Sequence, residues 1–431
     1  MRISFTLRKY FNLLVMTACF YTSHAGGELL PTPLSLSKAL SYADTDHPDL
    51  LLADAELAYA VSRKLEVESS NDVDVYFEIA PYTSKPTTND HFLNDSYIRF
   101  SVTKTLYDFG YSDSLEVSGD EAVLSQEFIA SDTRNKNYLK IMRLYFDVLL
   151  ADLHFSAIDE EMTTLYVKYD KLSDRKSLDM VSDVAVAEAE SIYREAADRR
   201  KLAELEQQEG RQRLAIALNR PDDIPGELIR PDLPELNQPI PEAESLLDDA
   251  INNNLMLTAL EHAVLADKAA LKATQQQFGP TLAAGLEMNE YERRLPGRSN
   301  ASVGVTLRIP ITNGGRSLAE TARATAQLSI SQAKYDQAKY SLRQKLFNLI
   351  RRLQLLKYKR TTDELRLNST ALTMEKSRAR YELEIQTTLG NTMAKYTLAE
   401  WLSAKNDFDM ATTWAQIEIL SGKKLYQDRK H

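Results

Sequence analysis

The polar residues with the clearest spacing in this 431-residue sequence lie in four short segments, where polar and apolar side chains alternate. These positions include Asp74, Glu78, Arg99, Thr103, Glu287, Asn289 and Arg308. A period of two places successive side chains on opposite faces of a strand. Each segment is therefore expected to have one face suited to water and one suited to an apolar environment. The chemistry of such a polar face is the solvation and charge selection of an aqueous path.

The sequence offers no catalytic or metal-binding pattern. Its six histidines lack the spacing of metal ligands, and Cys19 is the only cysteine. It contains neither a serine-centred glycine elbow nor a phosphate-binding loop. The formal net charge of -10 argues against a nucleic-acid partner, which requires a concentrated basic face. We expect neither an enzyme nor a bound cofactor or metal.

The alternating segments form two strand–loop–strand units. The first pairs strand 73–80 with strand 97–106 across a loop rich in Pro, Thr, Asn and Asp. The second pairs strand 281–289 with strand 301–309. Each strand has about ten residues, the length that crosses an outer membrane when tilted.

Each strand–loop–strand unit is followed by a long tract with the heptad-like spacing of a coiled coil. Leu139, Met142, Phe146, Leu149 and Leu153 follow a 3,4,3,4 spacing, and Leu342, Leu346, Leu349, Leu353 and Leu356 follow 4,3,4,3. A break over 177–182 is expected to fold the first tract into helices of roughly 60 and 35 residues, about 90 and 50 Å long. A helix is also expected before each unit, over 34–69 with a break at His47-Pro48, and over 243–276.

These patterns divide the chain into two structural repeats. Residues 1–25 have the basic start, apolar stretch and small-residue cleavage pattern of a signal peptide, with lipoprotein processing at Cys19 as the alternative. The first repeat covers 26–220 and the second 242–422, followed by a tail at 423–431. The proline-rich segment 221–241 between them is interpreted as an ordered connector, with a flexible linker as the alternative.

Four amphipathic strands are too few to form a closed barrel in a membrane. An open sheet edge is not tolerated in hydrocarbon, and about eight strands are needed for the smallest barrel. Several copies of the chain are therefore expected to share one barrel, of eight, twelve or sixteen strands. The alternative is a soluble sheet packed on helices.

The order and duplication of several motifs resemble the TolC-like outer-membrane channels. The motifs are Leu36–Leu40, Asp46–Leu50, the strand-to-helix junctions Leu106–Gly110 and Pro310–Gly315, and the endings Leu218–Pro221 and Leu420–Gly422. The resemblance implies an α+β membrane protein with a trimeric 12-strand β-barrel. Coiled-coil helical hairpins would continue it as a periplasmic α-barrel.

The implied function is an outer-membrane exit channel of a tripartite efflux pump or a type I secretion system. Its implied partners are two further copies of itself, outer-membrane lipid, a periplasmic adaptor, and an inner-membrane pump or ABC transporter. The alternative is a periplasmic coiled-coil scaffold without a pore.

The resemblance also points to the helical hairpin turns as the channel entrance. In the family these turns carry a glycine, and here Asp179 and Glu384 occupy the glycine positions. Together with Asp183 they form a candidate acidic entrance at the periplasmic tip. Ordinary solvated turn acids are the alternative interpretation.

Overall fold

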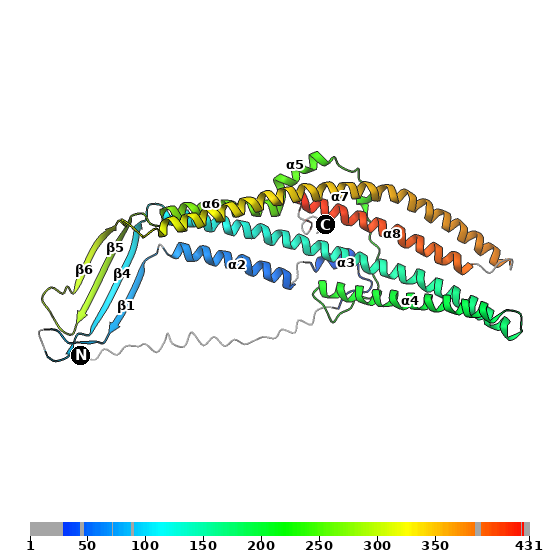
Figure 1. The fold of residues 1–431 in the computed structure, drawn as a ribbon, viewed down its shortest axis with the longest axis horizontal. Coiled ribbons are helices and arrows are strands. Elements are labelled where there is room, and N and C mark those ends of the chain that lie inside the picture. Colours follow the sequence, from blue (N-terminus) through cyan, green and yellow to red (C-terminus); the bar gives the residue numbers. More distant parts are fainter. Residues whose placement is uncertain are drawn as a thin grey trace.

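The computed structural model describes residues 29–43, 47–70, 72–87, 90–383, 389–423 and 425. The predicted signal peptide, Cys19 and Glu384 lie outside these residues, as does most of the tail 423–431. The molecule is long, with a sheet at one end and two helical hairpins at the other (Figure 1). No helix among the described residues is both long and apolar enough to cross a membrane.

Four antiparallel strands form the main sheet, in the order β1-β4-β5-β6. They are β1 (Asp74–Ala80), β4 (Tyr97–Tyr107), β5 (Thr281–Tyr291) and β6 (Ala301–Arg308). The strands of the two repeats meet where β4 pairs with β5. A small hairpin of β2 (Thr83–Ser84) and β3 (Leu93–Asn94) lies in the loop between β1 and β4. The four main strands therefore form one sheet shared by both repeats.

Two helical hairpins extend from the sheet. The first consists of α3 (Tyr111–Ser177) and α4 (Asp183–Ala217), and the second of α7 (Arg316–Glu382) and α8 (Leu389–Leu420). The first hairpin turns within the predicted break. α3 and α7 both have 67 residues. α3 is longer than the predicted length of roughly 60 residues, because it begins at Tyr111, directly after the strand-to-helix junction.

The two strand-to-helix junctions share the same left-handed backbone conformation. Gly110 and Gly315 precede α3 and α7 with φ angles of 92° and 82°. The residue before each, Phe109 or Gly314, also has a positive φ. At the first junction the Asp108 carboxylate accepts the Gly110 and Ser112 N–H groups at 3.2 and 2.9 Å. Two consecutive left-handed residues thus turn the extended chain into a helix over a few positions.

The helices next to the sheet are α2 (Pro48–Ser69) and α6 (Leu255–Gln276), which pack on α3, and α6 also contacts α7. Two shorter helices, α1 (Leu36–Ser41) and α5 (Ala243–Asn253), precede them. The expected single helix 243–276 is wrong, because Asn254 is extended and divides it. The Asn254 side chain caps α6 by accepting the Leu257 N–H at 3.0 Å.

The buried core lies at the middle of the molecule. The coiled-coil residues Met142 and Phe146 of α3 are buried with Leu214 of α4 and Phe408 of α8, and the Phe146 and Phe408 rings stack 4.4 Å apart. A second cluster is centred on Leu346 and Leu353 of α7. The predicted heptad-like spacing is therefore confirmed by burial.

The proline-rich segment 221–241 lies between α4 and α5. It contains a short 3-10 helix, η2 (Pro234–Asn237), and buries Leu228 and Leu236. Ile229, by contrast, is 46% exposed. The Tyr145 hydroxyl lies 2.7 Å from the Leu34 carbonyl and 2.6 Å from the Ile229 carbonyl. This contact joins the connector and the N-terminal segment to α3.

Candidate functional site

Strand register places the seven predicted polar residues of the strands on one face of the sheet. Glu78 is opposite Arg99, which is opposite Asn289, and Asp74 is opposite Thr103. Glu287 is two positions before Asn289, and Arg308 pairs with Thr281 of β5. Directly opposed residues share a face, and so do residues two apart on one strand. The alternation in the sequence is thus converted into a single polar surface.

Arg99 is the centre of a hydrogen-bonded network on this surface. Its guanidinium lies 3.2 Å from Glu78, 3.3 Å from Glu287 and 3.2 Å from the Asn289 side-chain oxygen. Asn289 in turn donates to Glu287 at 2.6 Å and is 8% exposed. Two carboxylates surround one guanidinium, so the cluster carries one net negative charge. The cluster connects β1, β4 and β5 and holds its three charged side chains in place. It offers neither a nucleophile nor an acid–base pair.

The remaining polar-face residues lie apart from this network. Within the described residues, neither Asp74 nor Arg308 forms an ion pair. Asp74 and Thr103 share a row with Gly285 and Gly304. The row thus has little side-chain bulk on β5 and β6. The predicted set therefore comprises one cluster and three separate residues.

The opposite face of the sheet is apolar and exposed. Its residues include Val75, Phe77, Ile79, Val102, Leu286, Val303, Val305 and Leu307. Val303 is 83% exposed and Phe77 66%. An apolar surface of this extent indicates contact with lipid or with another protein. Lys104 and Glu290, which were not predicted as site residues, also lie on this face. The signal for them is the same alternation, because Lys104 follows Thr103 and Glu290 follows Asn289 on their strands.

The α3–α4 turn contains both described tip acids. Asp179 has a φ of 56°, a left-handed conformation that fits the predicted glycine position. Asp183 is the first residue of α4 and forms an exposed ion pair with Lys176 at 2.7 Å. This pair lowers the pKa of Asp183 and raises that of Lys176. Lys176, which sequence reasoning missed, partly neutralises the proposed acidic entrance, and the role of the tip acids stays a prediction.

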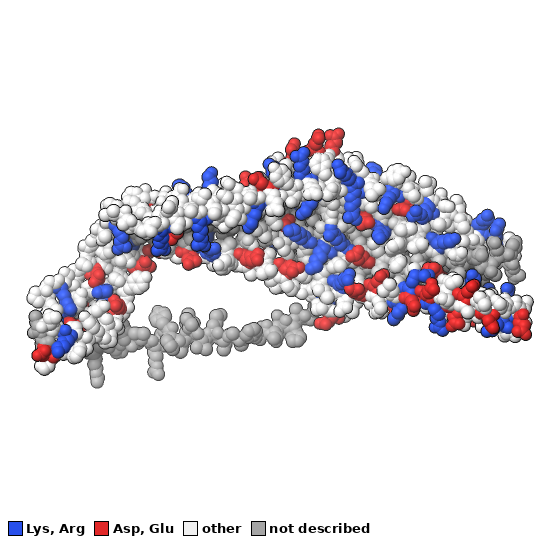
Figure 2. Space-filling view, in the orientation of Figure 1, with Lys and Arg blue, Asp and Glu red and all other residues white. Residues whose placement is uncertain are grey.

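Charge is distributed differently over the helices and the sheet. In Figure 2 acidic and basic side chains intermix over the helices, densely so around the α3–α4 hairpin, whereas much of the sheet is white. Several of these charges pair between helices, such as Arg211 of α4 with Asp152 of α3 at 2.7 Å. The described residues contain no cluster of side chains that could hold a metal ion. The charged residues of the helices therefore lie mostly on helix surfaces, where some of them also pair between neighbouring helices.

Part of the chain matches a known protein family. Residues 246–417, within the second repeat, match the family model described as outer membrane efflux protein. No curated protein matched the sequence.

Solved structures match nearly the whole chain. The CmeC outer membrane channel of Campylobacter jejuni has 12% identity and a TM-score of 0.75, over 90% of this chain and 85% of CmeC. The outer membrane protein VceC of Vibrio cholerae has 16% identity and a TM-score of 0.70, over 90% and 96% of the two chains. The MtrE outer membrane channel of Neisseria gonorrhoeae has 16% identity and a TM-score of 0.71, over 90% and 89%. Residues 246–417 therefore resemble the outer membrane efflux proteins, and the chain as a whole has the fold of these outer-membrane channels.

Proposed function

We propose that this protein is the outer-membrane exit channel of a tripartite efflux pump or type I secretion system. Three copies would form one passive conduit, with a 12-strand β-barrel in the outer membrane and a helical barrel in the periplasm. A periplasmic adaptor would join the conduit to an inner-membrane pump or ABC transporter. The efflux assignment is favoured because the family match is to efflux proteins.

The free edges of the sheet support assembly from several copies. Among the residues that the structure describes, β1 and β6 each pair on one side only, so both present unpaired backbone groups (Figure 1). Such groups are costly in hydrocarbon and also promote pairing with another chain. Pairing β6 of one copy with β1 of the next would remove every edge when the ring closes.

The two faces of the sheet support an aqueous lumen inside a lipid-facing wall. The polar face bearing the Arg99 cluster would line the lumen, and the apolar face with Val303 and Phe77 would contact lipid. Lys104, near the helices, would then lie at the periplasmic surface of the outer membrane, where long basic side chains extend toward water. The helices would extend into the periplasm, away from the membrane.

The helices also have unpartnered apolar surface. Exposed apolar residues on α7 include Leu318, Tyr340, Leu355, Tyr358, Leu365 and Leu372. Neighbouring copies would cover this surface in a closed helical barrel. Energy would come from the inner-membrane partner, because the sequence contains no phosphate-binding loop.

The single observation that carries the proposal is a four-stranded amphipathic sheet with two free edges. The test is single-channel conductance of the detergent-purified oligomer in a planar bilayer, with its mass determined on the same sample. The expected result is large, uniform steps from a trimer. A protein that is monomeric and soluble without detergent would refute the proposal and favour the coiled-coil scaffold.

A further inference from the structure

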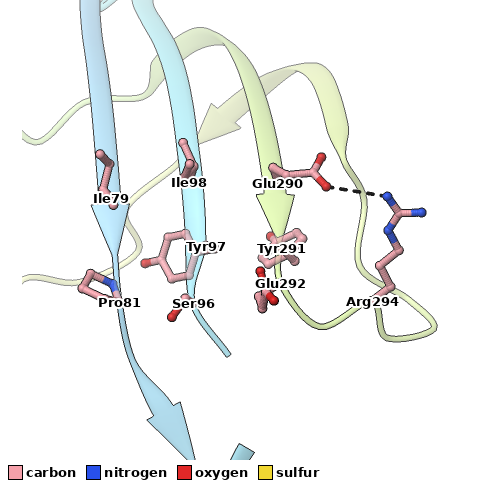
Figure 3. Close-up of a pocket in the computed structure, with 9 residues that line it drawn as sticks. All are labelled: Ile79, Pro81, Ser96, Tyr97, Ile98, Glu290, Tyr291, Glu292 and Arg294. Atoms are coloured by element: carbon pink, nitrogen blue, oxygen red, sulfur yellow. Dashed lines mark ion pairs between the residues drawn. The ribbon is translucent and has the colours of Figure 1, made fainter. Parts of the chain in front are cut away.

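The polar face of the sheet continues beyond the ends of β4 and β5. Tyr97 is opposite Tyr291 in the strand register, and their rings lie 6.0 Å apart at the end of the sheet farthest from the helices (Figure 3). Past them, the Glu292 N–H donates to the Ser96 carbonyl at 3.0 Å, so the antiparallel register is kept. The proposed function makes this end the outer mouth of the lumen, and the inference rests on that function.

The next pair on the polar face consists of Asp95 and Arg293. Arg293 lies 3.1 Å from the Asp95 carboxylate, and Arg298 lies 3.6 Å from the same oxygen. Neither contact is aligned as a hydrogen bond, so attraction between opposite charges holds both arginines. Asp95 is 3% exposed and also accepts a hydrogen bond from the Ser84 hydroxyl. Because a buried carboxylate requires partners, Asp95 fixes both guanidinium groups in place.

The loop after β5 folds back over this face. The Arg298 N–H donates to the Leu295 carbonyl at 3.2 Å and closes a turn around Pro296 and Gly297. Gly297 has a φ of 90°, and proline followed by a left-handed glycine is the signature of a type II turn. The turn brings the Arg298 guanidinium to 4.7 Å from the centre of the Tyr291 ring. Since Tyr291 belongs to the polar face, Arg298 lies on the side of the sheet that would line the lumen.

We propose that this loop forms a constriction at the outer mouth of the lumen and limits which solutes leave the channel. Asp95 holds the loop over the polar face through Arg293 and Arg298, and in a closed ring each copy contributes one such loop. The three side chains carry one net positive charge, which is opposite in sign to the charge of the Arg99 cluster deeper in the sheet. The mouth therefore selects cargo by size and favours anions locally, since charged rings select by sign.

The test compares the wild type with Asp95→Asn and Arg298→Gln in planar bilayers, after each variant is confirmed to have the oligomer mass of the wild type. Uncharged polyethylene glycols of increasing size are added to one side at a time. The largest polymer that still lowers the conductance gives the size limit of that mouth. The matched control is Arg294→Gln, since Arg294 belongs to the same loop but is 84% exposed and pairs with Glu290, away from the two tyrosines (Figure 3).

Asp95→Asn and Arg298→Gln are both expected to raise the size limit at the sheet end and to leave the limit at the helical end unchanged. Their reversal potentials are expected to shift in opposite directions, toward anions when Asp95 loses its charge and toward cations when Arg298 does. Arg294→Gln is expected to keep the size limit of the wild type. Arg298 is 28% exposed, so its variant decides the outcome if Asp95→Asn does not assemble.

Wild-type size limits in Asp95→Asn and Arg298→Gln would overturn the proposal, as would an equal increase in the control. Reversal potentials that shift in the same direction would overturn the role given to the charges. Conductance of the wild type separates this inference from the proposed function. A conducting wild type whose size limit the variants do not change overturns only the constriction, whereas a wild type without conductance overturns the channel itself.

Discussion

Asn135 is predicted to hold the C-terminal segment in the core. Its side chain is fully buried on α3. The amide nitrogen donates to the Lys423 carbonyl at 3.2 Å, and the amide oxygen accepts the Leu425 N–H at 3.2 Å. Leu425 itself is 4% exposed and belongs to the central cluster. One side chain therefore satisfies two backbone groups on a segment nearly 300 positions away in sequence.

The expected effect of Asn135→Ala follows from these two bonds. Each buried backbone group left without a partner costs about 1–3 kcal/mol. Partial relaxation leaves a loss of roughly 3 kcal/mol for two groups in the local opening of the segment. Because every 1.4 kcal/mol is tenfold, opening should become about 100-fold more frequent.

Amide hydrogen exchange of the peptide covering 418–425, followed by mass spectrometry in detergent, measures this opening directly. The control is Asn137→Ala, which removes an equally sized buried amide from the same helix but one that donates to the Ala43 carbonyl. Exchange near Leu425 should accelerate only in Asn135→Ala. Unchanged protection in Asn135→Ala, or equal acceleration in both variants, would refute the role assigned to Asn135.

Four further predictions concern the Arg99 cluster, the α3–α4 turn and the connector. Arg99→Gln leaves Glu78 and Glu287 without their guanidinium, so bilayer reversal potentials should shift toward cations; an unchanged potential would remove the cluster from the conduction path. Asp183→Asn leaves Lys176 unpaired at the tip and should lower cation selectivity, with Lys176→Gln shifting it in the opposite direction. The Lys176–Asp183 ion pair requires an ionised Asp183 and a protonated Lys176, so its contribution to the stability of the α3–α4 turn should be present between about pH 4 and pH 10. It should be lost below this window as the carboxyl is protonated, and above it as the amine is deprotonated. Limited proteolysis of the turn should therefore become faster outside this window. Tyr145→Phe should destabilise the oligomer by about 1–2 kcal/mol, because the Leu34 and Ile229 carbonyls lose their shared donor; denaturant unfolding followed by circular dichroism would detect it.

The hydroxyl of Tyr145 also keeps its proton because it is buried. Burial raises the pKa of its hydroxyl to about 12. The hydroxyl therefore remains a donor throughout the pH range of the proposed tests. Its loss by substitution, and not its titration, is the informative perturbation.

The repeating elements can be predicted from the sequence alone. Period-two alternation identified the strands, because one face of each strand differs from the other along the whole segment. The spacing of Leu346 and Leu353 identified the coiled coil, and the duplicated junctions before Gly110 and Gly315 identified the repeat. These are local properties, and local chemistry is sufficient to set them.

Which of these residues come into contact depends on the three-dimensional packing of the elements. The Arg99 cluster depends on β4 pairing with β5, a contact between residues nearly 200 positions apart, and no local pattern specifies that register. Lys176 reaches Asp183 only because the chain reverses at a left-handed Asp179. Asn135 and the C-terminal segment are likewise joined by folding alone. Periodicity reports the environment of a side chain, whereas its partner is chosen by how distant elements pack.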